Sequence, residues 1–479
     1  MNQVWTVARA ELSWLSRSRL AQLSAGIFVV LLCLSVLTSS MFLSREAGHR
    51  QSHQSEAGDI FDSQPDRHPH RMVHYGQYVF RTPPPLASID PGLDAYGGTS
   101  LFLEGHRKNA AMFSGAGEGA ALVRFGSLTP AFSLQVLAPL LLILIGHSSV
   151  TRERETSTLK ALLAQGVELR KIALGKFVVL LMACALCIAV LAFAATASLT
   201  ASATDGLAAL TFVAAYGVYL TVWAMIVVTT SCLMQRSNSA FLALTALWML
   251  TAVVVPRLAA EVANTAAPLE SAFARAMQLN AELRALGDAH NTNDPNYQSF
   301  QAKVLADYGV ETPDELPINI RGLLAVEGER QGAEVLARFT KVDQDARHMQ
   351  QAIIAAAGLV SPMLALQTAS QAIAGTDLRA YHSFLDDAES HRIAFVQELN
   401  MLQATDVDYA LDKIKSVDVQ AEQATRVSAD AWSKLPQFSF TPAPVATRIG
   451  TAWPSIMLLG LWLTAGGVVF LWATRQRTV

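Results

Sequence analysis

The sequence has little charge and few cysteines. Asp, Glu, Lys and Arg make up only 16% of its 479 residues, whereas soluble domains are nearer a quarter charged. The net charge is -3 and no block is rich in Lys and Arg, so nothing indicates a nucleic-acid partner. All four cysteines lie within apolar runs, which excludes a disulfide framework in an exported domain and a four-thiolate zinc site.

Motifs for nucleotide binding and catalysis are missing as well. The segment from Gly166 to Gly175-Lys176 superficially resembles a phosphate-binding loop, but the pattern G-x-x-x-x-G-K-[ST] fails at Arg170 and at Phe177. Neither the zinc-protease motif H-E-x-x-H nor the serine-hydrolase motif G-x-S-x-G occurs. The sequence therefore predicts a chain that is not an enzyme and that holds no cofactor of its own.

Long apolar runs are abundant. A helix that crosses a bilayer needs about 20 mostly apolar residues, and the runs that qualify are 21–43, 127–149, 174–198, 208–233, 240–257 and 452–473. None has a charged residue at its centre, whereas carriers driven by protons or sodium usually keep such residues near the midplane. We expect an all-α membrane protein with six spans, and the absence of midplane charge argues against a secondary transporter.

Two features inside these runs have structural and functional interpretations. Tyr216, Tyr219 and Trp223 form a stripe at helical spacing, which we interpret as a packing or dimer seam in preference to the lining of a substrate path. Pro139 should kink its helix. That kink is equally compatible with a hinge and with a fixed bend.

The distribution of Lys and Arg predicts the topology. Basic residues occur in the N-terminal segment, in 150–176, around Arg236 and in the tail, and the positive-inside rule puts these segments in the cytoplasm. The loop 199–207 has none and is expected outside, together with two long polar insertions. The predicted order is an interfacial helix and first span (1–43), the first insertion (44–126), spans two to five (127–257), the second insertion (258–450), and the sixth span with its tail (451–479).

The two insertions differ in composition. The first is rich in Gly, Pro, Ser and His, which predicts irregular structure. The second has helical periodicity over 259–287, 297–308, 320–350 and 377–433. Its apolar stretch 352–370 is a marginal seventh span, but Ser361-Pro362 interrupts it, so we favour a buried or membrane-surface helix.

The charged segment 150–176 between the second and third runs is amphipathic. Leu159, Leu162, Leu163, Ile172 and Leu174 recur at roughly helical spacing, which predicts a helix or a helix pair with one apolar face. A membrane protein usually offers such a helix to a partner. The alternative is a helix that lies on anionic lipid headgroups.

Several short motifs in this segment resemble those of a known family. Its elements Glu153-Arg154-Glu155, Thr158-Leu159, Leu162-Leu163, Val167 and Leu174-Gly175-Lys176 resemble the first cytoplasmic loop of type-2 ABC exporter permeases, although Ser157 stands where that family usually has Gly. The resemblance implies a coupling helix at 150–173 that docks on an ATPase subunit. The residues that it implies for this contact are Glu153, Glu155, Thr158, Leu159, Leu162 and Leu163.

The resemblance also implies the remaining partners. ATP and Mg would be held by two copies of the ATPase subunit, and a second permease subunit, the same or related, would complete the pathway. The pairing surface would involve the first, second and fifth spans. The membrane would be the bacterial inner membrane, with lipid around the spans and a periplasmic partner as a further candidate.

Motifs in the two insertions narrow the resemblance to one subfamily. Their matching elements include His74-Tyr75-Gly76, Asp90-Pro91-Gly92, Leu103-Glu104-Gly105-His106-Arg107, Ser361-Pro362 and Ala374-Gly375-Thr376-Asp377. They resemble a subfamily of these permeases with a large extracytoplasmic insert, catalogued mainly as a domain of unknown function. The candidate functional cluster outside the membrane is His74, Tyr75, Asp90, Glu104, His106 and Asp377.

His68, His70 and His74 raise the question of a metal. An H-x-H pattern with a third histidine nearby could ligate copper or zinc. The segment has no cysteine and a loop-like composition, so we favour a solvated or locally hydrogen-bonded histidine cluster and expect no metal.

Two functions remain in competition. The first is the permease subunit of an ATP-driven exporter. The second is a mechanotransmission device, in which nothing crosses the membrane and the large outer domain acts on a periplasmic or outer-membrane partner. A third interpretation, an enzyme or sensor in the outer domain, has no motif behind it.

Overall fold

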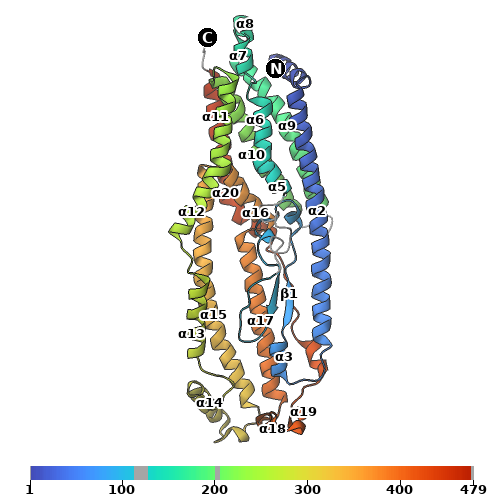
Figure 1. Ribbon diagram of the computed structural model, residues 1–479, viewed down its shortest axis with the longest axis vertical. Helices are drawn as coiled ribbons and strands as arrows, with labels where there is room; N and C mark the ends of the chain where they lie inside the picture. Colours follow the sequence, from blue (N-terminus) through green and yellow to red (C-terminus); the bar gives the residue numbers. More distant parts are fainter. Residues whose placement is uncertain (1, 113–127, 200–204, 476–479) are drawn as a thin grey trace.

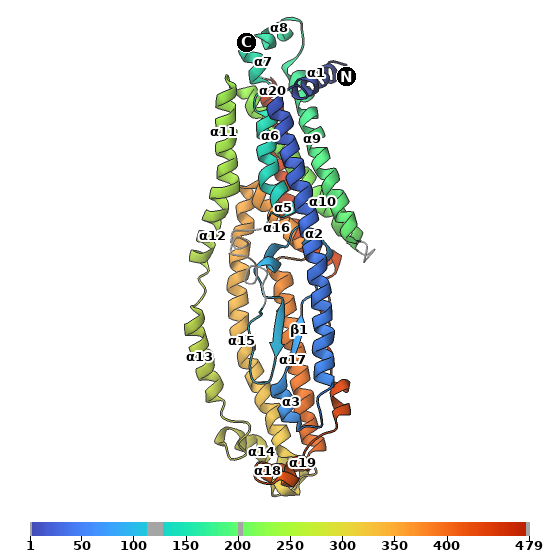
Figure 2. The same cartoon turned by 45° about the vertical axis from the view of Figure 1, so that its right-hand side comes forward.

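The computed structural model describes residues 2–112, 128–199 and 205–475. The loop 199–207 and the end of the first insertion therefore fall partly outside the described residues. The molecule is elongated (Figures 1 and 2). The start of α1 (Asn2–Leu15), the end of α20 (Val445–Arg475) and the short helices α7 (Thr151–Glu155) and α8 (Thr158–Ala164) lie at one end, and both insertions extend to the other.

Six helices of the described chain are long and apolar enough to cross a membrane, which confirms the predicted number. They are Arg19–Asp62, Pro130–Glu155, Leu169–Ser198, Gly206–Leu233, Ser237–Ala266 and Val445–Arg475. Four correspond to single regular helices: α2 (Arg19–Asp62), α9 (Leu169–Ser198), α10 (Gly206–Leu233) and α20. The second consists of α5 (Pro130–Phe132), a π-helical turn (Ser133–Leu137) and α6 (Ala138–Gly146), followed by α7.

The π-helical turn precedes Pro139. Because proline has no N–H, the carbonyl of Gln135 loses its regular helical donor. The hydroxyl of Tyr219 on α10 donates to that carbonyl. The indole of Trp248 donates to the next carbonyl, that of Val136, at 3.0 Å. Two other spans therefore hold the distortion in place, which favours a fixed bend over a free hinge.

A second proline distorts the fifth span in the same way. This span consists of α11 (Ser237–Met249), a π-helical turn (Leu250–Val254) and α12 (Val255–Ala266). At the end of that turn Pro256 has no N–H to donate to the carbonyl of Thr251, five residues earlier. The hydroxyl of Ser361 donates to it instead, at 2.6 Å. Such π-bulges and their unpaired carbonyls give side chains from elsewhere a place to bind.

α10 lies at the centre of the spans. Tyr216, Tyr219 and Trp223 are at most 1% exposed and belong to the core formed with the other spans. The predicted packing seam is confirmed, but it is a seam within this chain. The three side chains are covered without a second subunit.

The marginal stretch 352–370 spans the end of one helix and most of the next. α15 (Ile320–Ala356) ends first, and α16 (Pro362–Ala374) begins after Ser361, whose hydroxyl accepts from the amide of Leu364 at 3.2 Å. α16 is largely buried and packs against α10 and α20. The favoured buried helix agrees with this arrangement, and the stretch is not among the six candidate spans.

The first insertion is more regular than predicted. α2 (Arg19–Asp62) continues 19 residues beyond the predicted end of the first span at 43, so the irregular structure predicted from residue 44 onward is wrong for those 19 residues. Between residues 44 and 62 there is no proline, and nothing stops the helix. Beyond it come α3 (Pro69–Tyr75), β1 (Gln77–Phe80) and β2 (Ser100–Leu103). The two strands pair antiparallel, with Gln77 opposite Leu103.

The second insertion is helical, as predicted, around two long helices. α15 and α17 (Leu378–Asp406) pack side by side, and they approach closely where Gly322 meets Ala404: a Cβ on Gly322 would lie 2.8 Å from that of Ala404. The flanking helices are α13 (Ala272–Ala285), α14 (Pro295–Tyr308), α18 (Tyr409–Ile414) and α19 (Val419–Ala424). The predicted continuous helical segment 377–433 is wrong beyond Asp406, where α17 ends in extended backbone at Val407.

Candidate functional site

The predicted coupling helix is a helix pair that projects from one end of the molecule (Figure 1). Within 150–173, α7 and α8 are followed by the first turn of α9, which begins at Leu169. Ser157, between α7 and α8, has φ 62°, a left-handed conformation that costs an L-residue roughly 1–2 kcal/mol and that glycine adopts freely. Ser157 therefore forms this turn in place of Gly, but its backbone is strained.

Hydrogen bonds fix α7 to the rest of the chain. The amide of Val150 donates to the hydroxyl of Ser231 on α10 at 2.9 Å. The guanidinium of Arg154 donates to carbonyls at the end of α10. The carboxylate of Glu155 accepts from the amide and the hydroxyl of Ser237, the first residue of α11, at 2.7 and 2.8 Å. α7 is therefore a rigid base between two spans.

A buried ion network ties the same base to α1 and α9. Lys176 of α9 is 2% exposed; its Nζ lies 2.5 Å from Oε2 of Glu11 and also pairs with Glu153. Arg152 donates to the same oxygen of Glu11 at 2.7 Å and lies over the ring of Trp14. Removing one member of such a buried network leaves the others charged and without a partner, which typically lowers the free energy of unfolding by about 3–5 kcal/mol.

Glu11 belongs to no recognised motif, and the sequence-based candidates missed it. The available signal was its isolation: it is the only acidic residue among the first 45. Gly175 completes the contact, because a Cβ there would lie 2.7 Å from the Cβ of Val7. The Leu174-Gly175-Lys176 element thus lets α1 lie against α9 and anchors α7 to both.

The apolar face of α8 is turned toward the chain's own core. Leu159 is 3% exposed, and Leu162 and Leu163 are half-buried beside it. The exposed residues of α8 are Thr158, Lys160, Ala161 and Ala164. The surface that α8 offers to a partner therefore consists of small side chains and one lysine, and Leu159 stabilises the helix from beneath.

The six candidate residues of the insertions fall into two groups. His74 and His106 have ring centroids 5.4 Å apart. Glu104, two residues before His106, accepts from the side-chain amide of Asn109 at 3.1 Å. The hydroxyl of Tyr75 accepts from Gln64 at the end of α2, at 2.9 Å. These four lie on α3 and beside β2.

Asp90 and Asp377 lie at the junction between the insertions and the spans. Asp377 caps α17 by accepting from the amide of Ala380 at 3.1 Å. Asp90 is buried and accepts from the hydroxyl of Ser370 on α16. That hydroxyl lies 3.0 Å from the hydroxyl of Tyr216 on α10. Burial raises the pKa of Asp90 to about 6, so this chain of hydrogen bonds couples the ionisation of an insertion residue to the core of the spans.

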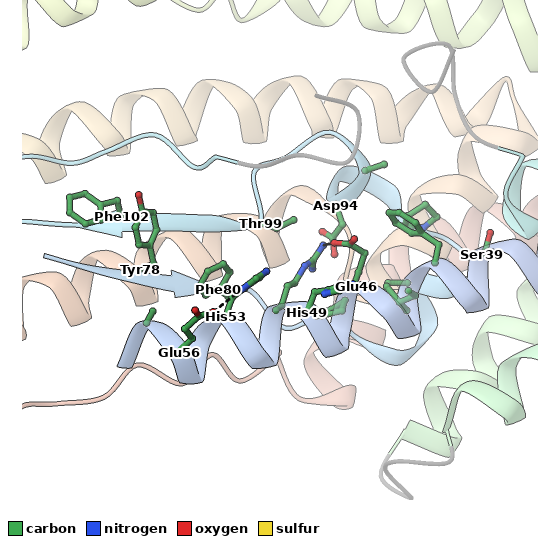
Figure 3. Close-up of a pocket in the computed structure, with 18 of the residues that line it drawn as sticks. Ser39, Glu46, His49, His53, Glu56, Tyr78, Phe80, Asp94, Thr99 and Phe102 are labelled. Carbon is green, nitrogen blue, oxygen red and sulfur yellow. Dashed lines mark ion pairs between the residues drawn. The ribbon is translucent and has the colours of Figure 1, made fainter. Parts of the chain in front are cut away.

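A cavity of about 1050 Å³ lies between α2 and β1. Figure 3 shows Glu46, His49 and His53 pointing from α2 toward the strands. Apolar side chains such as Phe42 and Phe102 form much of the rest of the wall. This mixture suits an amphipathic molecule better than an inorganic ion.

Two family models match the chain. One, described as ABC-2 family transporter protein, matches residues 5–286. The other, a domain of unknown function, matches residues 252–441. No curated protein matches the sequence significantly. The first match covers the first five spans and α13, and the second covers most of the helical insertion.

Proposed function

Because this chain belongs to the ABC-2 family of transporter proteins, we propose that it is the permease subunit of an ATP-driven exporter whose ATPase docks on α8. Family membership makes the chain a membrane subunit of an ABC transporter, a kind of subunit that is typically non-catalytic. It also implies association with an ABC ATPase subunit, which would hold ATP and Mg. The resemblance of the whole chain to permeases with a large insert is consistent with this assignment.

The observation that carries the proposal is the contrast between the two ends of the helix pair. α8 has an exposed face of small side chains and one lysine at one end of the molecule, over a buried Leu159. Its base, α7, is hydrogen-bonded to α10 and α11 and ion-paired to α1 and α9. A force applied to α8 therefore reaches four helices through hydrogen bonds and ion pairs, as a coupling element requires.

The same framework supports an orientation. Helices α7 and α8, the start of α1 and the end of α20 would lie in the cytoplasm, because their Lys and Arg residues follow the positive-inside rule. The insertions would then lie in the periplasm of a bacterial cell, with the spans in the inner membrane. Such an orientation exposes α8 to cytoplasmic ATPase subunits.

A second permease subunit, the same or related, would complete the pathway with two ATPase copies. The apolar parts of the first, fifth and sixth spans are 22%, 17% and 17% buried within this chain, whereas that of the second is 61% buried. The first and fifth spans therefore have more free surface for a partner than the second. Apolar side chains stay exposed along α12 beyond the predicted end of the fifth span at 257, at Leu258 and Val262, in line with helical arms that meet outside the membrane.

The docking proposal is tested on residues that this chain does not need for its own core. Ala161→Arg combined with Ala164→Arg should abolish co-purification of the co-expressed ATPase subunit, because both side chains are exposed on α8. Ala285→Arg, on the exposed surface of α13, is the matched control and should leave co-purification unchanged. Retention of the ATPase by the double variant, with membrane insertion intact, would rule out α8 as the docking element.

No observation on the described residues favours the purely mechanical alternative over a permease. The two alternatives differ in whether a molecule crosses the membrane. The cavity beside α2 is a site at which binding of such a molecule can be tested.

A further inference from the structure

Four histidine side chains meet at the surface of the insertions, from segments far apart in the sequence. His70 and His74 lie one turn apart on α3, His106 follows β2, and His290 lies in the loop between α13 and α14. The ring centroid of His70 is 4.7 Å from that of His74 and 4.6 Å from that of His290, and the centroid of His106 is 5.1 Å from that of His290. This grouping differs from the one considered from the sequence.

His68 does not take part. Its Nε2 lies 3.0 Å from Oδ1 of the buried Asp412, while its Nδ1 accepts from the amide of His70 at 3.2 Å. His68 therefore caps α3 and anchors it to α18, and the helix so anchored carries His70 and His74.

The ring nitrogens of His70, His74 and His106 lie near the separations that a metal ion would need, and the ring of His290 lies against those of His70 and His106. In the described part of the chain, the potential ligand atoms of His70, His74 and His106 all lie within 4.8 Å of one another. The Nε2 atoms of His70 and His74 are 3.2 Å apart. Tetrahedral zinc, with Zn–N bonds of 2.0–2.1 Å, separates its ligand nitrogens by about 3.4 Å. Rotation about side-chain bonds is enough to close the remaining distance.

His106 is oriented by a carboxylate. Its Nδ1 lies 3.2 Å from Oε2 of Glu329, and its backbone amide donates to the same oxygen at 3.2 Å. Arg392 holds the other oxygen of Glu329 at 2.6 Å. Glu329, ion-paired with Arg392, thus presents an acceptor oxygen to Nδ1 of His106, and this contact fixes the proton of His106 on Nδ1.

The consequence is an unprotonated Nε2 on His106. This atom is buried and has no hydrogen-bond partner within the described chain, and buried polar atoms without a partner are rare. A carboxylate behind a histidine that presents its other nitrogen is the usual support of a metal ligand, because it sets the tautomer and raises the basicity. The backbone of His106 is itself held in the left-handed region, with φ 65°.

The loop that carries His290 is seated on α15. A Cβ on Gly328 would lie 2.4 Å from the Cβ of Ala289, so only glycine at that position lets the loop approach. The side chain of Asp288 accepts from the amide of His290 at 2.9 Å. His290 is therefore presented to the other three rings by a packed turn.

We propose that His70, His74, His106 and His290 bind one divalent transition-metal ion of the zinc and copper class. Imidazole nitrogens suit zinc, copper and nickel, whereas calcium and magnesium need oxygen ligands. Four protein ligands leave no open position, which is characteristic of structural sites. The ion would clamp α3, the turn after β2 and the α13–α14 loop together, and so join the two insertions at a point remote from the spans.

The test uses the full chain, purified in detergent, stripped with a chelator and desalted. Titration with Zn²⁺ against a competing chromophoric chelator should give one site per chain with a Kd below about 1 µM, and Co²⁺ should give the visible absorption of a tetrahedral complex. His74→Ala changes an exposed side chain and should weaken binding at least about 100-fold. His106→Asn, which suits a left-handed backbone, should do the same.

A matched control is present in the same molecule. His49 and His53 on α2 have the same spacing as His70 and His74, and their rings stack 6.2 Å apart. Within the described residues they belong to no group of three potential ligands, and the carboxylate beside Nδ1 of His53, that of Glu56 at 3.6 Å, is exposed. His53→Asn should leave Zn²⁺ affinity and the Co²⁺ spectrum unchanged. The proposal is overturned if the stripped chain binds Zn²⁺ with a Kd above about 1 µM, or if His74→Ala and His53→Asn reduce binding equally. A Co²⁺ spectrum that His290→Asn leaves unchanged would overturn the four-histidine geometry.

Discussion

Replacing Asp412 with Asn should promote local unfolding at the end of the insertions that lies farthest from the spans. Asp412 is fully buried, and both of its carboxylate oxygens are occupied. Oδ1 lies 3.0 Å from Nε2 of His68 and 2.6 Å from Nζ of Lys415. Oδ2 accepts from Asn319 at 3.0 Å and from Gln403 at 3.1 Å. These donors hold the pKa of Asp412 well below its usual range even though burial opposes ionisation.

The size of the effect follows from this geometry. In either orientation of the new amide, its NH₂ group replaces one acceptor oxygen and faces two donors. Two hydrogen bonds to a charged group are lost, at about 1.5–3 kcal/mol each. Lys415 is 28% exposed at its side chain and can turn toward water, which recovers part of the loss. We therefore expect the free energy of local opening to fall by about 3 kcal/mol.

Hydrogen exchange of the full chain, followed by mass spectrometry on peptides covering α18 and the start of α15, measures that opening directly. A loss of about 3 kcal/mol corresponds to exchange roughly 150-fold faster. Asp408→Asn is the matched control: Asp408 is exposed and caps α18 through the amide of Leu411, and Asn caps equally well. Exchange in Asp412→Asn within threefold of the wild type would refute the account of Asp412 as the hub of this end.

Three further predictions concern the other end of the molecule and its orientation. Ser157→Gly should relieve the left-handed strain at φ 62° and stabilise α8 by about 0.5–1 kcal/mol, and slower exchange of the α8 amides is the measurement; faster exchange would contradict it. Glu11→Gln leaves Lys176 with one carboxylate and should lower the free energy of unfolding by about 3 kcal/mol, to be checked by thermal unfolding, where an unchanged Tm would count against the buried network. In a variant without the native cysteines, a cysteine at the exposed Gln298 should react with a membrane-impermeant thiol reagent in intact spheroplasts, whereas one at Ser157 should react only after permeabilisation. The reverse pattern would invert the proposed topology.

Much of the fold was predictable because it depends on local composition. The six spans follow from the length of the apolar runs, and the helix pair follows from the spacing of Leu159, Leu162 and Leu163. The error at the first insertion has a physical cause: Gly and Pro beyond residue 65 dominated its average composition, and the proline-free stretch that extends α2 was hidden within it. Composition averaged over a long segment does not locate a helix end.

The candidate site was only partly predictable. The charged residues of α7 were identified, but their roles were not, because a carboxylate that docks on a partner and one that pairs within the chain look alike in sequence. Glu11 and Lys176 lie 165 residues apart, and no local pattern joins them. The sequence correctly predicted an apolar face on α8. Which part of the protein that face contacts depends on the packing beneath the helix, and the sequence does not give it.

By itself the sequence determined the class of the protein: a six-span, mostly helical permease with two polar insertions, since hydrophobic length, Lys and Arg placement and family resemblance are all properties of the linear chain. Only the tertiary structure decided which residues meet. His70 and His290 are 220 residues apart in the sequence, yet their rings lie 4.6 Å from each other, because α3 and the α13–α14 loop both pack on the framework of α15 and α17. Long-range contacts of this kind depend on how whole helices pack, and no single segment of the sequence contains that information.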